Sequence, residues 1–213
     1  MVDNWLKRTK GPVILTEGDN DCHVIASLCQ KYSVAESFGF YSCGSDDGAI
    51  KRLNALLLSS EIPKKIAIVL DADNPNLESK WARIKNIVER NTEDGSSPDR
   101  PERNGTIVKL KNNIHLGIWF MPDNIVDGML EDFCIGIAPE QSIVEATAYV
   151  ERCKDNNLST HIDAHKSKAI IHAFLATQSE PGSPLGISIT RNTLNHRHPS
   201  VNKFVDWLNR VFN

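Results

Sequence analysis

Apolar residues change their spacing repeatedly along the first half of the chain, and each change predicts a new element. Short apolar runs predict strands at 13–15, 37–43 and 66–70. Each run is followed by apolar residues at helical spacing, over 21–32, 45–63 and 77–88. The resulting order of strand, helix, strand, helix, strand, helix predicts right-handed βαβ units and a mostly parallel sheet flanked by helices.

The second half of the chain begins with a polar segment over 91–105, which predicts a mobile surface loop. Two strand-like runs and then four helical patterns follow, at 107–110, 115–121, 129–135, 139–154, 163–177 and 200–212. Residues 179–198 are expected to be loop-rich. We therefore expect one α/β domain over 1–213, with a sheet core over about 12–135 and a helical C-terminal extension over about 136–213.

Composition and charge narrow the function classes. A net charge of −3 argues against a protein that coats nucleic acid through bulk positive charge, although a local basic groove stays open. No apolar run approaches the ~20 residues of a membrane-spanning helix, and the N-terminus lacks a signal-like apolar region. The odd number of cysteines, five, disfavours a disulfide framework and favours a cytoplasmic location.

Acidic residues stand where two of the predicted parallel strands end. Glu17 follows the first strand, and Asp71 and Asp73 follow the third. Ligands of open α/β sheets bind at this edge, and extended backbone would aim Asp71 and Asp73 the same way. Asp21 lies one helical turn after Glu17 and can face the same place. Clustered carboxylates repel one another, and a hard divalent cation relieves that repulsion, so the sequence predicts Mg²⁺ or Mn²⁺ and a phosphate-ester substrate.

Other interpretations of these residues stay open. Asp21 and its neighbours also suit a helix cap, and Asp71 and Asp73 suit an ordinary polar loop. Haloacid-dehalogenase-like phosphatases carry a DxD motif after an apolar strand, but on their first strand. Glycosyltransferases use a DxD motif to hold Mn²⁺ and a nucleotide sugar, which leaves the EGDND segment unexplained. A metal-stabilised interaction module without turnover also fits.

The segments ILTEGDNDCHVI and IAIVLDADNP resemble the Toprim domain, which carries a Glu after its first strand and a DxD after its third. The matching residues are Glu17, Asp71 and Asp73. The spacing of Glu17 and Asp21 is more similar to the Toprim nucleases of the OLD (overcoming lysogenization defect) type than to topoisomerases. The layout of the whole chain also resembles a small standalone Toprim-related family of unassigned function.

The OLD-type nucleases carry a later acidic motif and a lysine, and the segments MLEDF and HKSK resemble these two features. Glu131 would then join Asp21 at a second metal position. Lys168 would stabilise the charge that builds on the phosphate, with Lys166 as the other candidate lysine. Glu17 would be a metal ligand or the general base.

The chain has no room for the further domains of topoisomerases and primases. The resemblance therefore implies a Toprim-like fold and a metal-dependent phosphodiesterase acting on nucleic acid, DNA or RNA. The alternative is a catalytically silent metal- or nucleotide-binding module that acts through a partner protein.

Overall fold

A five-stranded sheet forms the centre of the computed structural model, which describes residues 11–73 and 75–213. The strand order is β2-β1-β3-β5-β4, and all neighbours are parallel except β4 and β5. The strands are β1 (Val13–Thr16), β2 (Gly39–Ser42), β3 (Lys65–Asp71), β4 (Thr106–Leu110) and β5 (Ile114–Met121). The prediction of an α/β fold with a mostly parallel sheet flanked by helices is confirmed.

The central strand β3 shows why the apolar run folds as it does. Every residue from Ile66 to Leu70 is fully buried. A strand covered on both faces needs apolar side chains at successive positions rather than at alternate ones. Ile68 packs into the apolar cluster on one face of the sheet, and Val69 packs into the cluster on the other. The sheet therefore separates two cores.

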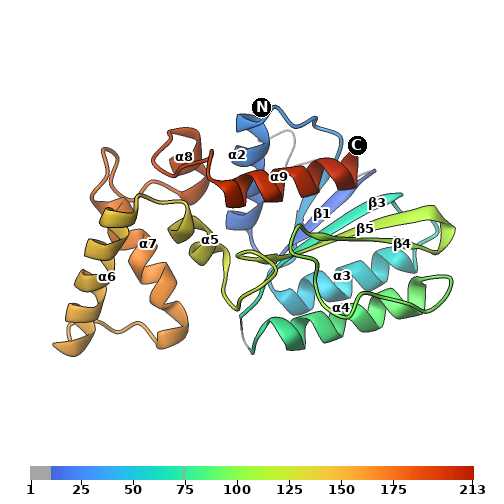
Figure 1. Ribbon diagram of the computed structural model, residues 1–213, viewed down its shortest axis with the longest axis horizontal. Coiled ribbons are helices and arrows are strands. Elements are labelled where there is room, and N and C mark those ends of the chain that lie inside the picture. The colour runs from blue at the N-terminus through green and yellow to red at the C-terminus, as the bar shows by residue number, and fades with distance from the viewer. Residues whose placement is uncertain (1–10, 74) are drawn as a thin grey trace.

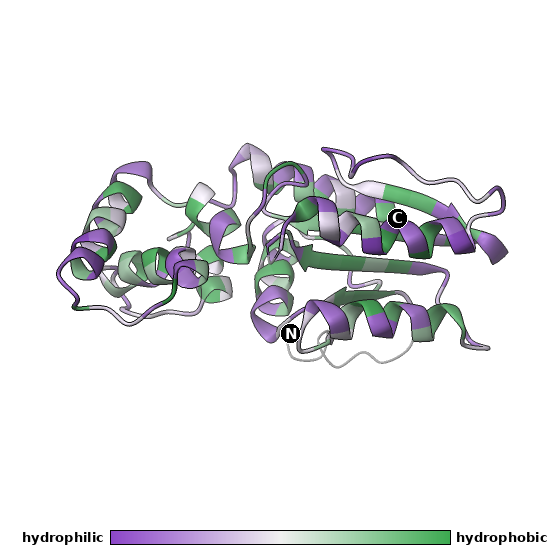
Figure 2. Cartoon of the chain, turned by 90° about the horizontal axis from the view of Figure 1, so that it is seen from below, coloured by the Kyte–Doolittle hydropathy of each residue, from purple (hydrophilic) through white to green (hydrophobic). Residues whose placement is uncertain are grey.

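Helices cover both faces of the sheet (Figure 1). One face carries α3 (Asp46–Leu57) and α4 (Leu77–Asn91), and the other carries α2 (Asp19–Lys31) and α9 (Pro199–Phe212). Three of them have side-chain N-caps, because Ser45 Oγ accepts a hydrogen bond from Gly48 N, Asn76 Oδ1 accepts one from Ser79 N and His198 Nδ1 accepts one from Ser200 N. Figure 2 shows hydrophobic strands between helices with hydrophobic and hydrophilic sides.

Four shorter or outlying helices follow β5, namely α5 (Leu130–Gly136), α6 (Glu140–Asp155), α7 (Lys166–Ala176) and α8 (Leu185–Thr190). Single 3-10 turns precede β5 and α7, at Lys111–Asn113 and Asp163–His165. The α6–α7 pair stands away from the sheet at the left of Figure 1, with α5 between the pair and the sheet. The chain then returns through α9, where Trp207 is fully buried and its Nε1 donates to Thr106 O at 3.2 Å.

The loop-rich segment 179–198 contains one short helix, α8, which the sequence analysis did not single out. Its six residues, LGISIT, give too short a pattern to show a helical period. Packing on α2 supplies the missing stability. A Cβ on Gly186 would lie 2.8 Å from His23 O, so the absence of a side chain there lets the two helices approach closely.

The order of the strands defines where a ligand site is expected. The chain adds β2 on one side of β1 and then places β3 on the other, so β1 and β3 flank a topological switch point. All five cysteines are free. Across the described ranges, no helix combines the length and the apolar character needed to cross a bilayer.

Candidate functional site

Glu17 and Asp71 meet at the carboxyl ends of β1 and β3. The two strands are parallel neighbours, with Leu15 in register with Ile68, so both chains leave the sheet at the same edge. Asp71 N donates a hydrogen bond to Glu17 Oε1 at 2.9 Å. The sequence prediction that these two carboxylates lie together therefore agrees with the geometry.

Asp21 reaches the same place from the first turn of α2. It is 6% exposed, and its Oδ2 accepts a hydrogen bond from Gly18 N at 3.1 Å. This bond serves as a helix cap, because Gly18 at the N-cap has no side chain of its own. Asp21 Oδ1 is buried and has no hydrogen-bond partner among the described residues. Capping thus accounts for one oxygen of Asp21 and leaves the other unexplained.

The start of α5 brings Glu131 to the cluster. Leu130 N donates to Asp71 Oδ1 at 2.8 Å, which fastens the N-terminus of α5 to the end of β3. The next residue, Glu131, is 5% exposed, and Lys168 Nζ on α7 lies 3.9 Å from its Oε1. Residues far apart in the sequence are therefore joined at one edge of the sheet.

A second contact holds α7 against α5. Ser167 Oγ donates to Asp132 Oδ1 at 2.5 Å, and Asp132 Oδ2 accepts from Met129 N at 2.8 Å. The side chains of Lys166 and Lys168, on either side of Ser167, contact different helices. Lys168 faces Glu131, whereas Lys166 Nζ pairs with Glu151 Oε1 at 2.7 Å on α6. The geometry therefore favours Lys168 over Lys166 as the lysine near the carboxylates.

Asp73 departs from the expectation of a continuous extended backbone. β3 ends at Asp71, and Ala72 N then donates to Met121 O, at the end of β5, and to Gly128 O, in the segment after β5. Asp73 then forms an isolated antiparallel bridge with Asn76. It still lies close enough to raise the pKa values of Asp71 and Glu17.

Burial and mutual repulsion set the electrostatics of the cluster. Burial raises the pKa of Asp71 to about 8, and the charges of Asp21, Glu17 and Asp73 add to this effect. Burial likewise raises the pKa of Asp21 to about 7, with further contributions from Glu17 and Glu131. Burial also raises the pKa of Glu17, against the opposing effects of the Asp71 N–H and Lys80. The cluster has a shortage of positive charge.

Lys80 on α4 is the charged neighbour that the sequence analysis missed. Its side chain is 3% exposed, and Nζ lies 3.0 Å from Asp46 Oδ2 and 3.9 Å from Glu17 Oε1. Although burial opposes it, hydrogen bonding to Lys80 holds the pKa of Asp46 below its ordinary value. The available signal was position, because Lys80 lies three residues after Leu77 and four before Ile84 on the apolar stripe of α4.

The donor chemistry of the cluster fits a hard divalent cation. Glu17, Asp21 and Asp71 each anchor one oxygen on a backbone N–H, which orients the carboxylate and leaves it further acceptor capacity. The unpartnered Asp21 Oδ1 also suits such an ion. However, within residues 11–73 and 75–213 no group of three or more His, Cys, Asp or Glu side chains is arranged to hold a metal. Binding would require these side chains to draw together.

The chain matches the model of a family described as a protein of unknown function, DUF3226, over residues 11–213. The chain belongs to the DUF3226 family. Its matched region contains the whole cluster, from Glu17 to Glu131, and Lys168. Comparisons with curated proteins and with solved structures return no match.

Proposed function

We propose that this DUF3226 chain is a metal-dependent phosphodiesterase that acts on nucleic acid in the manner of the Toprim nucleases. The observation that carries the proposal is the buried, unpartnered Asp21 Oδ1 inside a carboxylate cluster at the switch point between β1 and β3. Ligands of doubly wound sheets bind at this place. Oxygen donors without a sufficient counter-charge favour a divalent cation over an uncharged ligand.

Glu17, Asp71 and Asp73 would hold the cation, and Glu131 with Asp21 would complete a second metal position. Mg²⁺ or Mn²⁺ supplies the positive charge that lets several carboxylates and a substrate phosphate share one place. The backbone N–H groups of Asp71 and Leu130 fix the orientation of Glu17 and Asp71 before any ligand arrives. These bonds hold one oxygen of each of the two carboxylates, and the other side chains would have to move to complete the site.

Lys168 would bind an oxygen of the phosphate. Its ammonium lies beside Glu131 and is about half exposed, so it can exchange this partner for a substrate anion. The Ser167–Asp132 hydrogen bond fixes the start of α7 and with it the position of Lys168. A fixed ammonium stabilises negative charge that grows in the transition state of phosphoryl transfer.

A catalytically silent module that binds a metal ion or a nucleotide, and acts through a partner protein, is the second candidate. The observation in its favour is that the described side chains do not already converge on a metal position. A site that binds weakly, or only together with a partner, needs no such convergence.

Incubation of the purified chain with Mn²⁺ and labelled single- and double-stranded DNA and RNA tests the proposal. Cleavage that EDTA stops and that Glu17→Gln abolishes in a folded protein supports it. Glu36→Gln, an exposed substitution elsewhere on the chain, is the matched control and should cleave like the parent. Metal-induced stabilisation without cleavage of any of these substrates would favour the silent module instead.

A further inference from the structure

A cavity of about 550 Å³ opens next to the carboxylate cluster. Its walls come from the start of α4, the polar loop before β4 and the segment after β5. Asn76 lines the cavity and forms the backbone bridge with Asp73, so the cavity and the cluster share a boundary. Its volume is typical of pockets that hold a single small ligand.

One buried side chain in this pocket has a donor without a partner. Asn124 is 3% exposed, and its Oδ1 accepts a hydrogen bond from Phe120 N at 2.7 Å. This bond fixes which end of the amide is the oxygen. Asn124 Nδ2 is buried and finds no hydrogen-bond partner in the described part of the chain. A ligand acceptor that reached this donor from the pocket would satisfy it.

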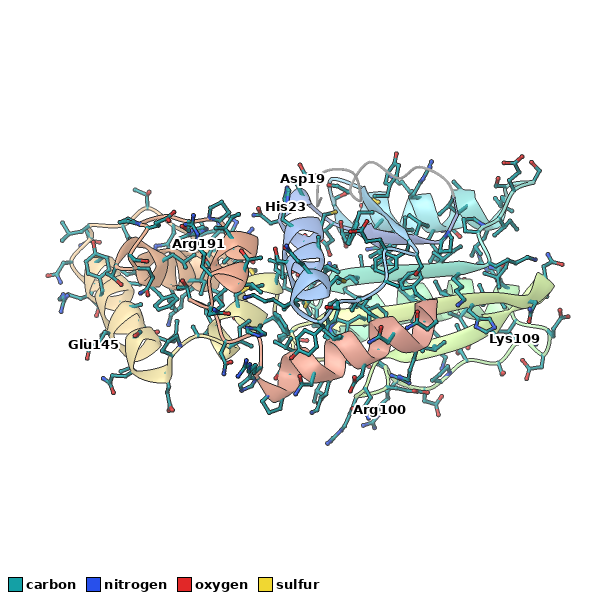
Figure 3. All side chains as sticks on the ribbon, turned by 90° about the horizontal axis from the view of Figure 1, so that it is seen from above. Asp19, His23, Arg100, Lys109, Glu145 and Arg191 are labelled. Atoms are coloured by element: carbon teal, nitrogen blue, oxygen red, sulfur yellow. The ribbon has the colours of Figure 1, made fainter. Side chains whose placement is uncertain are left out.

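Two arginines give the pocket its positive charge. Arg100 and Arg103 lie on the loop before β4, and Trp81 Nε1 donates to Asp99 O at 3.0 Å, which ties this loop to α4. Figure 3 shows Arg100 extending outward from the loop, well apart from Lys109. Neither guanidinium pairs with a carboxylate of the described residues. Unpaired guanidinium groups at the mouth of a pocket suit a phosphate.

Three carboxylates, Glu78, Asp99 and Asp127, also line the pocket, and two of them have partners outside it. Asp127 Oδ1 accepts a hydrogen bond from Leu77 N at 2.8 Å, and Asp99 Oδ1 pairs with Lys85 Nζ at 3.2 Å. The rest of the wall includes apolar surface from Leu77, Pro101 and Ile125, and Ile125 is 45% exposed. A phosphate-binding mouth beside an apolar wall matches the two halves of a nucleotide, its phosphate and its base.

We propose that this pocket binds one unpaired nucleotide of the substrate strand, with its phosphate on Arg100 and Arg103 and its base near Asn124. The inference rests on the proposed function, because it places this nucleotide beside the phosphodiester at the carboxylate cluster. A base inside a duplex is stacked and paired, so it reaches a pocket only when it is unpaired or flipped out. The preferred substrate is therefore single-stranded nucleic acid or an unpaired end.

Fluorescence anisotropy in EDTA, with short labelled DNA and RNA as single strands and as duplexes, tests the pocket without any cleavage. The parent should bind single strands about tenfold more tightly than duplex. The double variant Arg100→Ala/Arg103→Ala should lose about tenfold in affinity, and its slope of log K against log salt should fall by about 0.7, for the one phosphate that the two arginines share. Lys109→Ala/Lys203→Ala removes two exposed charges elsewhere and should bind like the parent.

Asn124→Asp adds a test of the pocket's interior. Aspartate keeps the acceptor for Phe120 N and tolerates the left-handed backbone of residue 124, with φ 65°, but it replaces the free donor with an acceptor. Folded Asn124→Asp should bind single strands about tenfold more weakly than the parent. The proposed pocket would be refuted by any of three results. These are equal losses of affinity in the arginine and lysine double variants, equal affinity of the parent for single strands and duplex, or no binding by the parent.

Cleavage with Mn²⁺ separates the two proposals. If single-strand binding depends on Arg100 and Arg103 but the chain cleaves no substrate, the nucleotide pocket is supported and the phosphodiesterase proposal is refuted. If the arginine double variant cleaves with unchanged KM and kcat, the phosphodiesterase proposal is supported and the nucleotide pocket is refuted.

Discussion

Replacing Asp71 with asparagine removes the charge of this side chain and keeps its shape. The substituted amide would still present an Oδ1 to Leu130 N, so the contact between β3 and α5 can persist. Burial and the neighbouring carboxylates raise the pKa of Asp71 from 3.8 to about 8. The folded chain therefore holds a proton that the unfolded chain releases near pH 3.8.

The sign of the effect follows from this proton. A carboxyl group with a raised pKa in the folded state contributes its full stability below pH 3.8, and the contribution is lost as the pH rises towards 8. Between pH 3.8 and pH 7 the loss amounts to about 4 kcal/mol at ~1.4 kcal/mol per pH unit. Because Asp71 is partly exposed and shares its repulsion with Asp21, we expect about half of this, ~2 kcal/mol.

Thermal unfolding measured by circular dichroism in EDTA, at several values between pH 4 and pH 8, checks the magnitude. Asp71→Asn should match the parent near pH 4 and should unfold about 4–8 °C higher near pH 8, at 2–4 °C per kcal/mol for a chain of this size. Glu145→Gln, on the outer side of α6 in Figure 3, is the control and should show no such dependence on pH.

Mn²⁺ reverses the ranking if Asp71 is a ligand. At about one hundred times its Kd the ion should stabilise the parent by ~2.7 kcal/mol and should leave Asp71→Asn nearly unchanged. A variant that unfolds at a lower temperature than the parent at pH 8 would refute the reasoning from burial. An equal response of both proteins to Mn²⁺ would place the metal elsewhere.

Two further predictions concern the lysines. Lys168→Ala should lower kcat with Mn²⁺ by about a hundredfold and leave metal-induced stabilisation intact. Lys166 pairs with Glu151, so Lys166→Ala should retain nearly parental turnover. Similar small losses in both variants would contradict the role of Lys168. Lys80→Met should destabilise the chain by about 3 kcal/mol in urea unfolding, because it leaves Glu17 without its cationic neighbour and Asp46 with Arg83 alone. Lys80→Arg should recover part of this loss. A loss under ~0.5 kcal/mol for the methionine variant would show that the ion pairs of Lys80 contribute little to stability.

Local patterns were sufficient to predict the sheet. The run from Ile66 to Leu70 reads as a strand covered on both faces, and it is one. The alternation of predicted strands and amphipathic helices then predicted the parallel arrangement of β1, β2 and β3. These features depend on neighbours within a few residues, which the sequence shows directly. The short helix α8 depends instead on its fit against α2, and its pattern alone did not show it.

Some features of the candidate site could also be predicted from the sequence, and others could not. Strand ends predict where Glu17 and Asp71 lie, because the sheet geometry is regular. Asp73 lies beyond the end of β3 rather than on a continued strand, but it stays close enough to raise the pKa values of Asp71 and Glu17. The hydrogen bond from Leu130 N to Asp71 depends on tertiary packing, so no spacing in the sequence could show it. The spacing of Lys80 on α4 indicates a buried position, but the carboxylates that it meets come from other elements and depend on the packing.

The burial of these carboxylates argues for a ligand on energetic grounds. Asp21 is buried and Asp71 is half-buried, and both have raised pKa values, while Lys80 is shared between Glu17 and Asp46. A fold that needed only stability would be served as well by apolar side chains here, because burying incompletely paired charges is destabilising. Local violations of this kind are expected where a chain gives up stability to bind something. A ligand at the unpartnered Asp21 Oδ1 would supply the contact that this buried oxygen lacks and so offset the cost of burying it.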